Sequence, residues 1–128
     1  HRTEVGKKIE RWKKIVLESS KQCGRSKIPL VAEDVETLET FCRKNDHQDL
    51  KLIFWELEEK KTLKDIKLDV QPRSVAVLIG PEGGFSQAEI ENVREYGFQT
   101  VGLGPRILRA ETAPVVALAL LQSRWGDL

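Results

Sequence analysis

The chain contains no methionine, only two cysteines and no long apolar run. Because methionine is missing, the chain does not begin at a translational start, and we expect a fragment or processed product that lacks an N-terminal domain. Cys23 and Cys42 have neither CxxC nor Cys/His ligand spacing, so we interpret them as reduced cytosolic thiols rather than a disulfide or metal ligands. No stretch approaches the ~20 apolar residues that cross a bilayer. No secretory signal pattern opens the chain.

The composition is typical of one folded globular domain. The 128 residues are 40% hydrophobic and 32% charged, which excludes a disordered chain. The net charge is only +1, but residues 1–27 hold nine Lys and Arg against three Glu. Such a segment fits either a surface that faces phosphate groups or an ordinary solvated helix face, and the sequence leaves both interpretations open.

Hydrophobic spacing and turn residues predict an alternation of helices and strands. Ser86 and Glu89 form a capping-box pattern before one of the helices. The alternation favours an α/β fold, with a mostly parallel sheet flanked by helices on both faces. The last helix is apolar nearly all round, so we expect one of its faces to meet another subunit. We predict helices over 4–23, 32–44, 87–96 and 113–125, strands over 50–57, 75–79 and 98–103, an extended piece over 28–31, and a loop with at most a weak helix over 58–71.

Two glycine-bearing loops follow the last two predicted strands. The first spans residues 78–86 and reads LIGPEGGFS, and the second spans residues 102–113 and reads GLGPRILRAETA. Strand ends that turn through glycine expose backbone N–H and C=O groups, and open α/β sheets bind ligands at such edges. Two such loops in one small domain predict a single composite pocket.

The residues of these loops favour a flat, cationic ligand over a phosphate. GPEGG is not GxGxxG, and no P-loop lysine with Ser or Thr follows it. Pro81 removes a backbone donor, and the Glu82 carboxylate would repel phosphate but could pair with a cation or accept from hydroxyls. The alternative is a tight turn without a ligand. In the second loop, Arg106 or Arg109 could hold a phosphate or a base edge, or form an ion pair with Glu111 or Glu82.

The two loops closely resemble those of the SPOUT class of RNA methyltransferases. Within that class the match is to the ribosomal RNA small subunit methyltransferase E family, which makes 3-methyluridine in 16S rRNA. The resemblance rests on the segments LIGPEGGFS (78–86), Glu89-Ile90 and LGPRILRAETA (103–113). Two upstream segments, ERWKKIV (10–16) and SKQCGRSKIP (20–29), support it. The resemblance covers essentially the whole chain.

The resemblance implies a SPOUT-like methyltransferase domain over residues 10–128 with a C-terminal trefoil knot. Residues 1–9 would be the tail of a connection to an absent PUA-like RNA-binding domain. The implied partners are 16S rRNA or the small ribosomal subunit and a second copy, joined through the C-terminal helix and knot, in the cytoplasm, with no metal and no membrane. The implied cofactor is S-adenosylmethionine, held by Leu78, Gly80, Pro81, Glu82, Gly83, Gly84, Leu103, Gly104, Ile107 and Leu108.

The resemblance also suggests roles in the reaction. Uridine N3 must lose its proton before it attacks the methyl group, and an arginine can stabilise the resulting anion. Arg109 is the first candidate for this role and Arg106 the second, with Glu111 as proton acceptor, directly or through water. Candidate RNA contacts lie after the first helix, at Gln22, Arg25 and Lys27.

Two other functions remain open at this stage. One is a non-catalytic RNA-binding or ribosome-assembly module on the same fold. The other is a nucleotide-binding α/β domain of another kind, which the missing phosphate-loop lysine disfavours. Binding of S-adenosylmethionine would separate the enzyme from the binding module.

Overall fold

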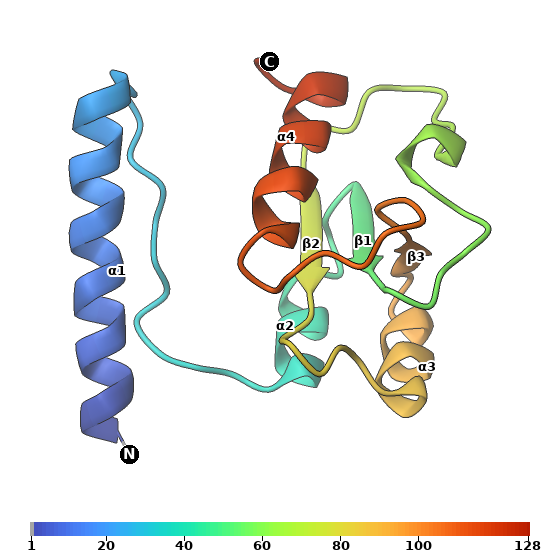
Figure 1. Cartoon of the computed structure of the whole chain (residues 1–128), viewed down its shortest axis with the longest axis horizontal. Helices are drawn as coiled ribbons and strands as arrows, with labels where there is room; N and C mark the ends of the chain where they lie inside the picture. Colours follow the sequence, from blue (N-terminus) through green and yellow to red (C-terminus); the bar gives the residue numbers. More distant parts are fainter. Residues whose placement is uncertain (1) are drawn as a thin grey trace. The chain divides into compact units, whose positions relative to one another are not determined.

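The computed structural model describes residues 2–128, with side chains from residue 4 onward, so His1 of the predicted connection lies outside the described residues. The chain divides into two compact units, residues 1–37 and 38–128. The first unit holds α1 (Arg2–Cys23), drawn in blue in Figure 1, which confirms the predicted first helix. An ion pair between Lys13 and Glu33 joins this helix to the irregular segment that follows it.

The end of α1 is a tight, glycine-based turn. Gly24 has a φ of 78°, a conformation that costs glycine little, and the amide of Arg25 donates to the carbonyl oxygen of Ser20 at 2.9 Å. The Nε of Arg25 donates to the carbonyl oxygen of Lys27 at 3.0 Å. The three residues Gln22, Arg25 and Lys27 are exposed around this turn.

The second unit is built on a sheet of three parallel strands in the order β2-β1-β3. This arrangement confirms the predicted α/β class and parallel sheet. The register pairs Phe54 of the central strand with Ile79 on one side and Val101 on the other. All three strands therefore end side by side at one edge of the sheet. The strands are β1 (Leu50–Phe54), β2 (Val75–Ile79) and β3 (Gln99–Val101).

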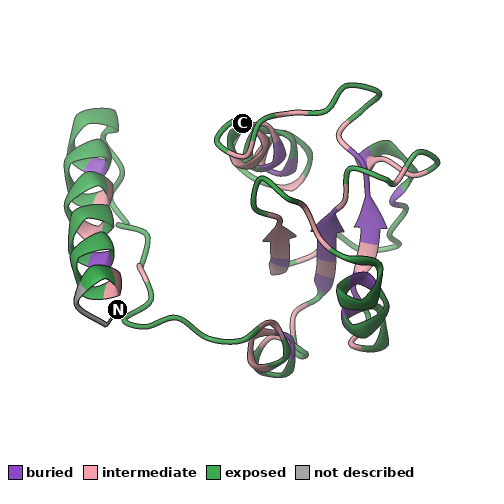
Figure 2. Cartoon of the chain, turned by 60° about the horizontal axis from the view of Figure 1, so that its bottom comes forward, coloured by how far each residue is buried: buried purple, intermediate pink, exposed green. Residues whose placement is uncertain are grey.

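Hydrophobic clusters lie on both faces of the sheet. Because side chains alternate along a strand, Leu52 of β1 packs with one cluster and Ile53 with the other. The Leu52 side includes Ala117 and Leu121 of the last helix, and the Ile53 side includes Cys42 and Ile90. Figure 2 shows the buried residues along the strands and on the inner sides of the helices. The helices are α2 (Leu38–Lys44), α3 (Gln87–Glu95), α4 (Ala113–Trp125) and the 3₁₀ turn η1 (Leu63–Asp65).

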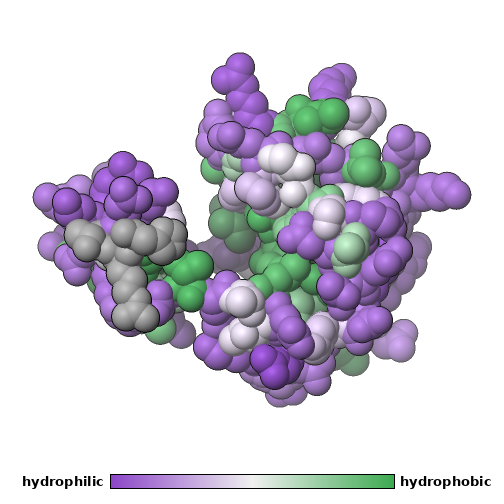
Figure 3. Space-filling view, turned by 90° about the horizontal axis from the view of Figure 1, so that it is seen from below, coloured by the Kyte–Doolittle hydropathy of each residue, from purple (hydrophilic) through white to green (hydrophobic). Residues whose placement is uncertain are grey.

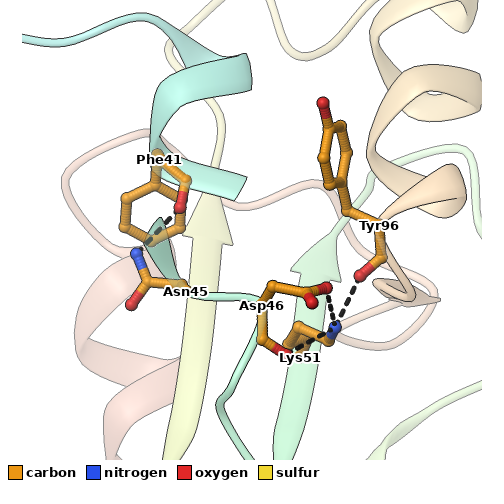
Figure 4. Close-up of polar contacts among 5 residues, drawn as sticks. All are labelled: Phe41, Asn45, Asp46, Lys51 and Tyr96. Carbon is orange, nitrogen blue, oxygen red and sulfur yellow. Dashed lines mark hydrogen bonds and ion pairs between the residues drawn. The ribbon is translucent and has the colours of Figure 1, made fainter. Parts of the chain in front are cut away.

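A lysine on the central strand joins β1 to the end of α3. The Nζ of Lys51 donates to the carbonyl oxygen of Tyr96 at 2.6 Å, and to the backbone oxygen and Oδ1 of Asp46, each at 3.2 Å (Figure 4). The last carbonyls of a helix lack intrahelical partners, so this ammonium group satisfies one of them. Nearby, Asn45 donates from its side-chain amide to the carbonyl oxygen of Phe41 at the end of α2.

The helix predicted over 32–44 is wrong in its first half, because α2 begins only at Leu38. Two features explain the late start. Oδ1 of Asp34 accepts from the amide of Val35, a local bond that competes with helix formation. Val35 is also 68% exposed, so no apolar contact holds this stretch in a helix. The extended piece predicted over 28–31 forms no strand in the described part of the chain.

Two predicted strands are shorter than expected. The strand predicted over 50–57 ends at Phe54, because the amide of Glu58 turns back to the carbonyl oxygen of Trp55. The strand predicted over 98–103 is reduced to 99–101, because the amide of Gly102 leaves the ladder and donates to the carbonyl oxygen of Lys61. The strand over 75–79, the helix over 113–125 and the capping box of Ser86 and Glu89 are confirmed.

Candidate functional site

A pocket lies at the edge where the three strands end. Its volume is about 650 Å³, counting the part open to solvent. Parallel sheets bind ligands at the carboxyl ends of their strands, and this pocket takes wall residues from beyond all three. Its lining consists of Phe54 at the end of β1 with Trp55 and Glu56 after it, Ile79 at the end of β2 with Gly80, Pro81, Gly84 and Phe85 after it, and Leu103, Gly104, Pro105, Arg106, Ile107, Leu108, Ala110 and Ala113 after β3.

Hydrophobic residues dominate the middle of this face. In Figure 1 the arrow of β2 points to the bottom of the picture, and Figure 3 looks at the molecule from that side. On the second unit, green hydrophobic residues gather in a hollow that purple hydrophilic residues surround. An apolar floor with a charged rim suits an organic ligand with a few polar groups.

The first glycine loop forms one wall through its backbone. The amide of Gly84 donates to the carbonyl oxygen of Pro81 at 2.8 Å, and Gly84 has a φ of 71°. The ring of Phe85 folds back onto Gly80, where an added Cβ would lie 3.1 Å from the ring. Because Gly80 has no side chain, the ring of Phe85 can pack against it in the pocket wall.

The second glycine loop forms the opposite wall and leads into α4. Gly104 has a φ of 104°, a conformation that L side chains rarely adopt. The carbonyl oxygen of Arg109 accepts from the amides of Thr112 and Ala113, both at 2.9 Å, so the loop turns tightly just before the helix. Ile107 is exposed on this wall, and Leu108 is half-buried.

Charged side chains lie at the rim of the pocket. Arg106 and Glu56 belong to its lining, and both are exposed. Arg109 and Glu111 form an exposed ion pair with an N–O distance of 4.0 Å. An exposed pair at this distance adds little stability, so both groups remain accessible to a ligand. Among the described residues, no group of three or more His, Cys, Asp or Glu is placed to hold a metal ion.

The sequence matches a family of known activity. The family model described as an RNA methyltransferase domain matches residues 1–122. The chain belongs to this family. No helix in residues 2–128 of this RNA methyltransferase domain is long and apolar enough to span a membrane.

Curated relatives and solved structures agree with that assignment. The domain is 38% identical over 126 residues to the ribosomal RNA small subunit methyltransferase E of Buchnera aphidicola, covering 98% of this chain and 48% of the relative. It is 37% identical to the Bacillus subtilis protein of the same name, covering 90% and 46%. The chain therefore spans about half the length of the curated relatives that it matches.

Two solved structures share the fold. The first is a proposed methyltransferase from Legionella pneumophila in complex with the bound cofactor SAM, with a TM-score of 0.90 and 42% identity over 100% of this chain and 51% of that one. The second is the ribosomal RNA small subunit methyltransferase E of Neisseria gonorrhoeae bound to S-adenosyl methionine, with a TM-score of 0.79 and 36% identity over 98% and 51%.

The RNA methyltransferase domain brings most of the predicted cofactor residues to one pocket. These are Gly80, Pro81, Gly84, Leu103, Gly104, Ile107 and Leu108, and the predicted catalytic residue Arg106 lines the same pocket. The residues Leu78, Glu82, Gly83, Arg109 and Glu111 belong to the same two loops but do not line it. The predicted RNA contacts Gln22, Arg25 and Lys27 belong to the first unit. The binding roles of all these residues stay predictions.

The pocket wall that follows the central strand was not predicted from the sequence. Trp55, which lies in the strand predicted over 50–57, is half-buried and lines the pocket beside Phe54 and Glu56. The strand predicted over 50–57 did contain a signal for this wall, because parallel strands end at a common edge and the residues after each of them can reach the same pocket. What the sequence did not reveal was the strand order, which places the end of β1 between the two glycine loops.

Proposed function

We propose that this domain transfers the methyl group of S-adenosylmethionine to N3 of a uridine in 16S rRNA. The observation that carries the proposal is the single pocket formed by both glycine loops where the three parallel strands end. Support comes from two structures of the same fold that contain this cofactor and from curated relatives named for small-subunit rRNA methylation.

The pocket has the chemistry that this transfer requires. Apolar walls at Ile79, Leu103 and Leu108 exclude water from the methyl group, and the exposed Glu56 at the rim favours a positively charged sulfonium. In the reaction the deprotonated N3 forms a bond to the methyl carbon as the bond between sulfur and carbon breaks. The sulfur keeps that electron pair, and S-adenosylhomocysteine leaves with the methyl group on N3. Catalysis then depends mainly on alignment of the two reactants.

Arginine stabilises the uridine anion in this proposal. Arg109 is the first candidate, because its exposed guanidinium can exchange Glu111 for the anion at little cost. Glu111, released from Arg109, is then placed to accept the N3 proton, directly or through water. Arg106 is the second candidate, since it already lines the pocket.

The wider assembly follows from the same proposal. Val115 and Leu118, which lie one helical turn apart, form an exposed apolar side of α4, and we assign that side to a second copy in a homodimer. A C-terminal trefoil knot, a PUA-like domain to which residues 1–9 would be the connection, and cytoplasmic location belong to the same SPOUT-like assignment. The exposed turn with Gln22, Arg25 and Lys27 would contact RNA, on 16S rRNA or on the small ribosomal subunit.

A methyl-transfer assay tests the proposal. The protein is incubated with labelled S-adenosylmethionine and either 16S rRNA or small subunits, and the digested RNA is analysed by mass spectrometry for 3-methyluridine. Arg109→Ala should lower the rate about 100-fold with unchanged cofactor affinity, whereas exposed Lys67→Ala should match the wild type. Cofactor binding without transfer to either substrate would favour the non-catalytic RNA-binding module. Absence of cofactor binding by calorimetry would overturn the proposal.

A further inference from the structure

Residues 55–62, which we call the strap, leave the end of the central strand, and their far end pairs with Gly102, just after β3. The strap begins with a turn in which the amide of Glu58 donates to the carbonyl oxygen of Trp55 at 3.0 Å. Farther along, the carbonyl oxygen of Lys61 accepts from the amide of Gly102 at 2.7 Å, and Nζ of Lys61 donates to Oε1 of Gln99 at 2.6 Å. The strap therefore contacts β3 through both backbone and side chains.

A row of polar side chains from three segments holds the middle of the strap. The hydroxyl of Thr100 donates to Oε1 of Glu58 at 2.6 Å and accepts from a guanidinium nitrogen of Arg94 at 3.1 Å. A hydroxyl has only one proton, and the guanidinium cannot accept, so the directions of both bonds are fixed. Thr100 is 6% exposed, and a buried hydroxyl without partners would be costly.

The charges at the two ends of the row support this arrangement. The hydrogen bond from Thr100 is the largest cause that lowers the pKa of Glu58, with smaller contributions from the Lys60 amide and the charges of Arg94 and Lys61. Glu58 is therefore a carboxylate at neutral pH, as an acceptor from Thr100 requires. At the other end, the guanidinium carbon of Arg94 lies 5.9 Å from the centre of the Trp55 ring.

The strap supports two walls of the pocket at once. Trp55 and Glu56 lie on the strap and line one wall of the pocket. Leu103 and Gly104 line another wall and directly follow Gly102, which the strap contacts. That contact is close, because a Cβ on Gly102 would lie 2.5 Å from the carbonyl oxygen of Glu58. A shift of Glu58 would therefore move both walls.

We propose that Glu58 is a positioning residue for the pocket: through Thr100 and Arg94 it fixes the strap, and with it the wall formed by Trp55 and the start of the second glycine loop. Glu58 itself is absent from the pocket lining, so it acts through these neighbours. The proposal rests on the proposed function for the identity of the ligand, S-adenosylmethionine or its product.

Calorimetric titration with S-adenosylhomocysteine measures the effect on the pocket. Glu58→Ala and Thr100→Val each remove the hydrogen bond and should weaken binding about tenfold, because a small misplacement of a wall costs much of the fit. Glu58→Gln and Thr100→Ser keep an acceptor or a hydroxyl and should remain within about threefold of the wild type. Glu59→Ala is the matched control, because Glu59 is the exposed neighbour on the same strap. Circular dichroism confirms that each variant is folded at the temperature of the titration.

The pattern across the variants separates positioning from general stability. The double variant Glu58→Ala/Thr100→Val should bind no more weakly than Thr100→Val alone, because Thr100→Val already removes the bond to Glu58. The disruptive variants should raise the dissociation constant, and should raise KM for the cofactor more than they lower kcat. Glu58→Gln and Thr100→Ser should restore these values toward those of the wild type. Equal affinity of Glu58→Ala and the wild type, or additive losses in the double variant, would overturn the proposal.

A second readout does not depend on the cofactor. Hydrogen exchange of the Trp55 and Gly102 amides, which donate to Val101 and Lys61, reports the strap in the unliganded protein. Both amides should exchange about tenfold faster in Glu58→Ala and at the wild-type rate in Glu59→Ala. If the wild type binds no S-adenosylhomocysteine, the proposed function fails, and unchanged exchange in Glu58→Ala would then show that the positioning role fails as well.

Discussion

Nζ of Lys51 lies 2.6 Å from the carbonyl oxygen of Tyr96, so the central strand carries the cation that closes α3. The lysine side chain is 14% exposed, and its stem extends toward α3 from the same side of the sheet as Ile53. Gly97, which directly follows Tyr96, has a φ of 86°, and a Cβ there would lie 3.0 Å from Nζ of Lys51. A helix end, a glycine turn and a strand residue thus depend on one another.

Replacing Lys51 should destabilise the second unit. Lys51→Met keeps the apolar stem but removes the donors to Tyr96 and Asp46, and we expect a loss of about 1–3 kcal/mol in the free energy of unfolding. Urea denaturation followed by circular dichroism measures this loss. Lys67→Met, at an exposed position, is the control and should change the same quantity by less than about 0.5 kcal/mol. Equal stability of the two variants would contradict the role of Lys51.

Gly102 should tolerate no side chain. In Gly102→Ala the new Cβ would meet the carbonyl oxygen of Glu58 at 2.5 Å, and this backbone atom cannot move without the strap. We expect destabilisation of about 1–3 kcal/mol by thermal or urea denaturation. Gly83→Ala is the matched control, because nothing lies within 4 Å of its added Cβ. A Gly102→Ala variant as stable as Gly83→Ala would disprove the close contact.

The hydrogen bond of Glu58 should give stability a defined pH dependence. The folded state lowers the pKa of Glu58, mainly through Thr100, so this stabilisation is present above the ordinary pKa of the carboxyl and is lost as pH falls through the folded value. The difference in unfolding free energy between the wild type and Thr100→Val should be constant near neutral pH and shrink below about pH 4. Urea titrations over this range measure it. A difference that does not vary with pH would argue against an ionised Glu58 in this bond.

The two cysteines should react at very different rates. Cys23 is exposed, whereas Cys42 is 1% exposed and burial raises the pKa of its thiol, although the charge of Lys51 opposes the shift. The thiolate is the reactive form, so a colorimetric thiol reagent should modify Cys23 quickly and Cys42 only on unfolding. Cys23→Ser should abolish the fast phase. Two thiols that react at the same rate in the native protein would contradict the burial of Cys42.

Features that depend on neighbouring residues could be predicted from the sequence. The capping box of Ser86 and Glu89 is a contact across three residues, and Pro114 precedes an apolar run that extends to Leu121 in α4. The two glycine loops could also be predicted, because a strand that ends at Gly80 is a local signal. These elements follow from short-range chemistry, which a single sequence contains.

Features that depend on the strand order could not be predicted. Trp55 lines the pocket only because β1 lies between the other two strands, and no local pattern reveals that order. The row from Arg94 through Thr100 to Glu58 joins residues of α3, β3 and the strap, so it exists only in the folded chain. The late start of α2 had a local sign in Asp34, but its decisive cause is the missing burial of Val35.

The order β2-β1-β3 also has a consequence for the time course of folding. The central strand is the first of the three in the chain, and it pairs with segments that are distant in sequence, since Leu50 lies beside Val75 and Leu52 beside Gln99. No hairpin can form early in a sheet whose strands are all parallel, so each pairing must first close a long loop. During synthesis β1 therefore emerges without a partner strand. Both of its edges are paired only after β3, which ends at Val101, has joined the sheet. The edge that becomes the pocket is thus among the last parts of the second unit to form.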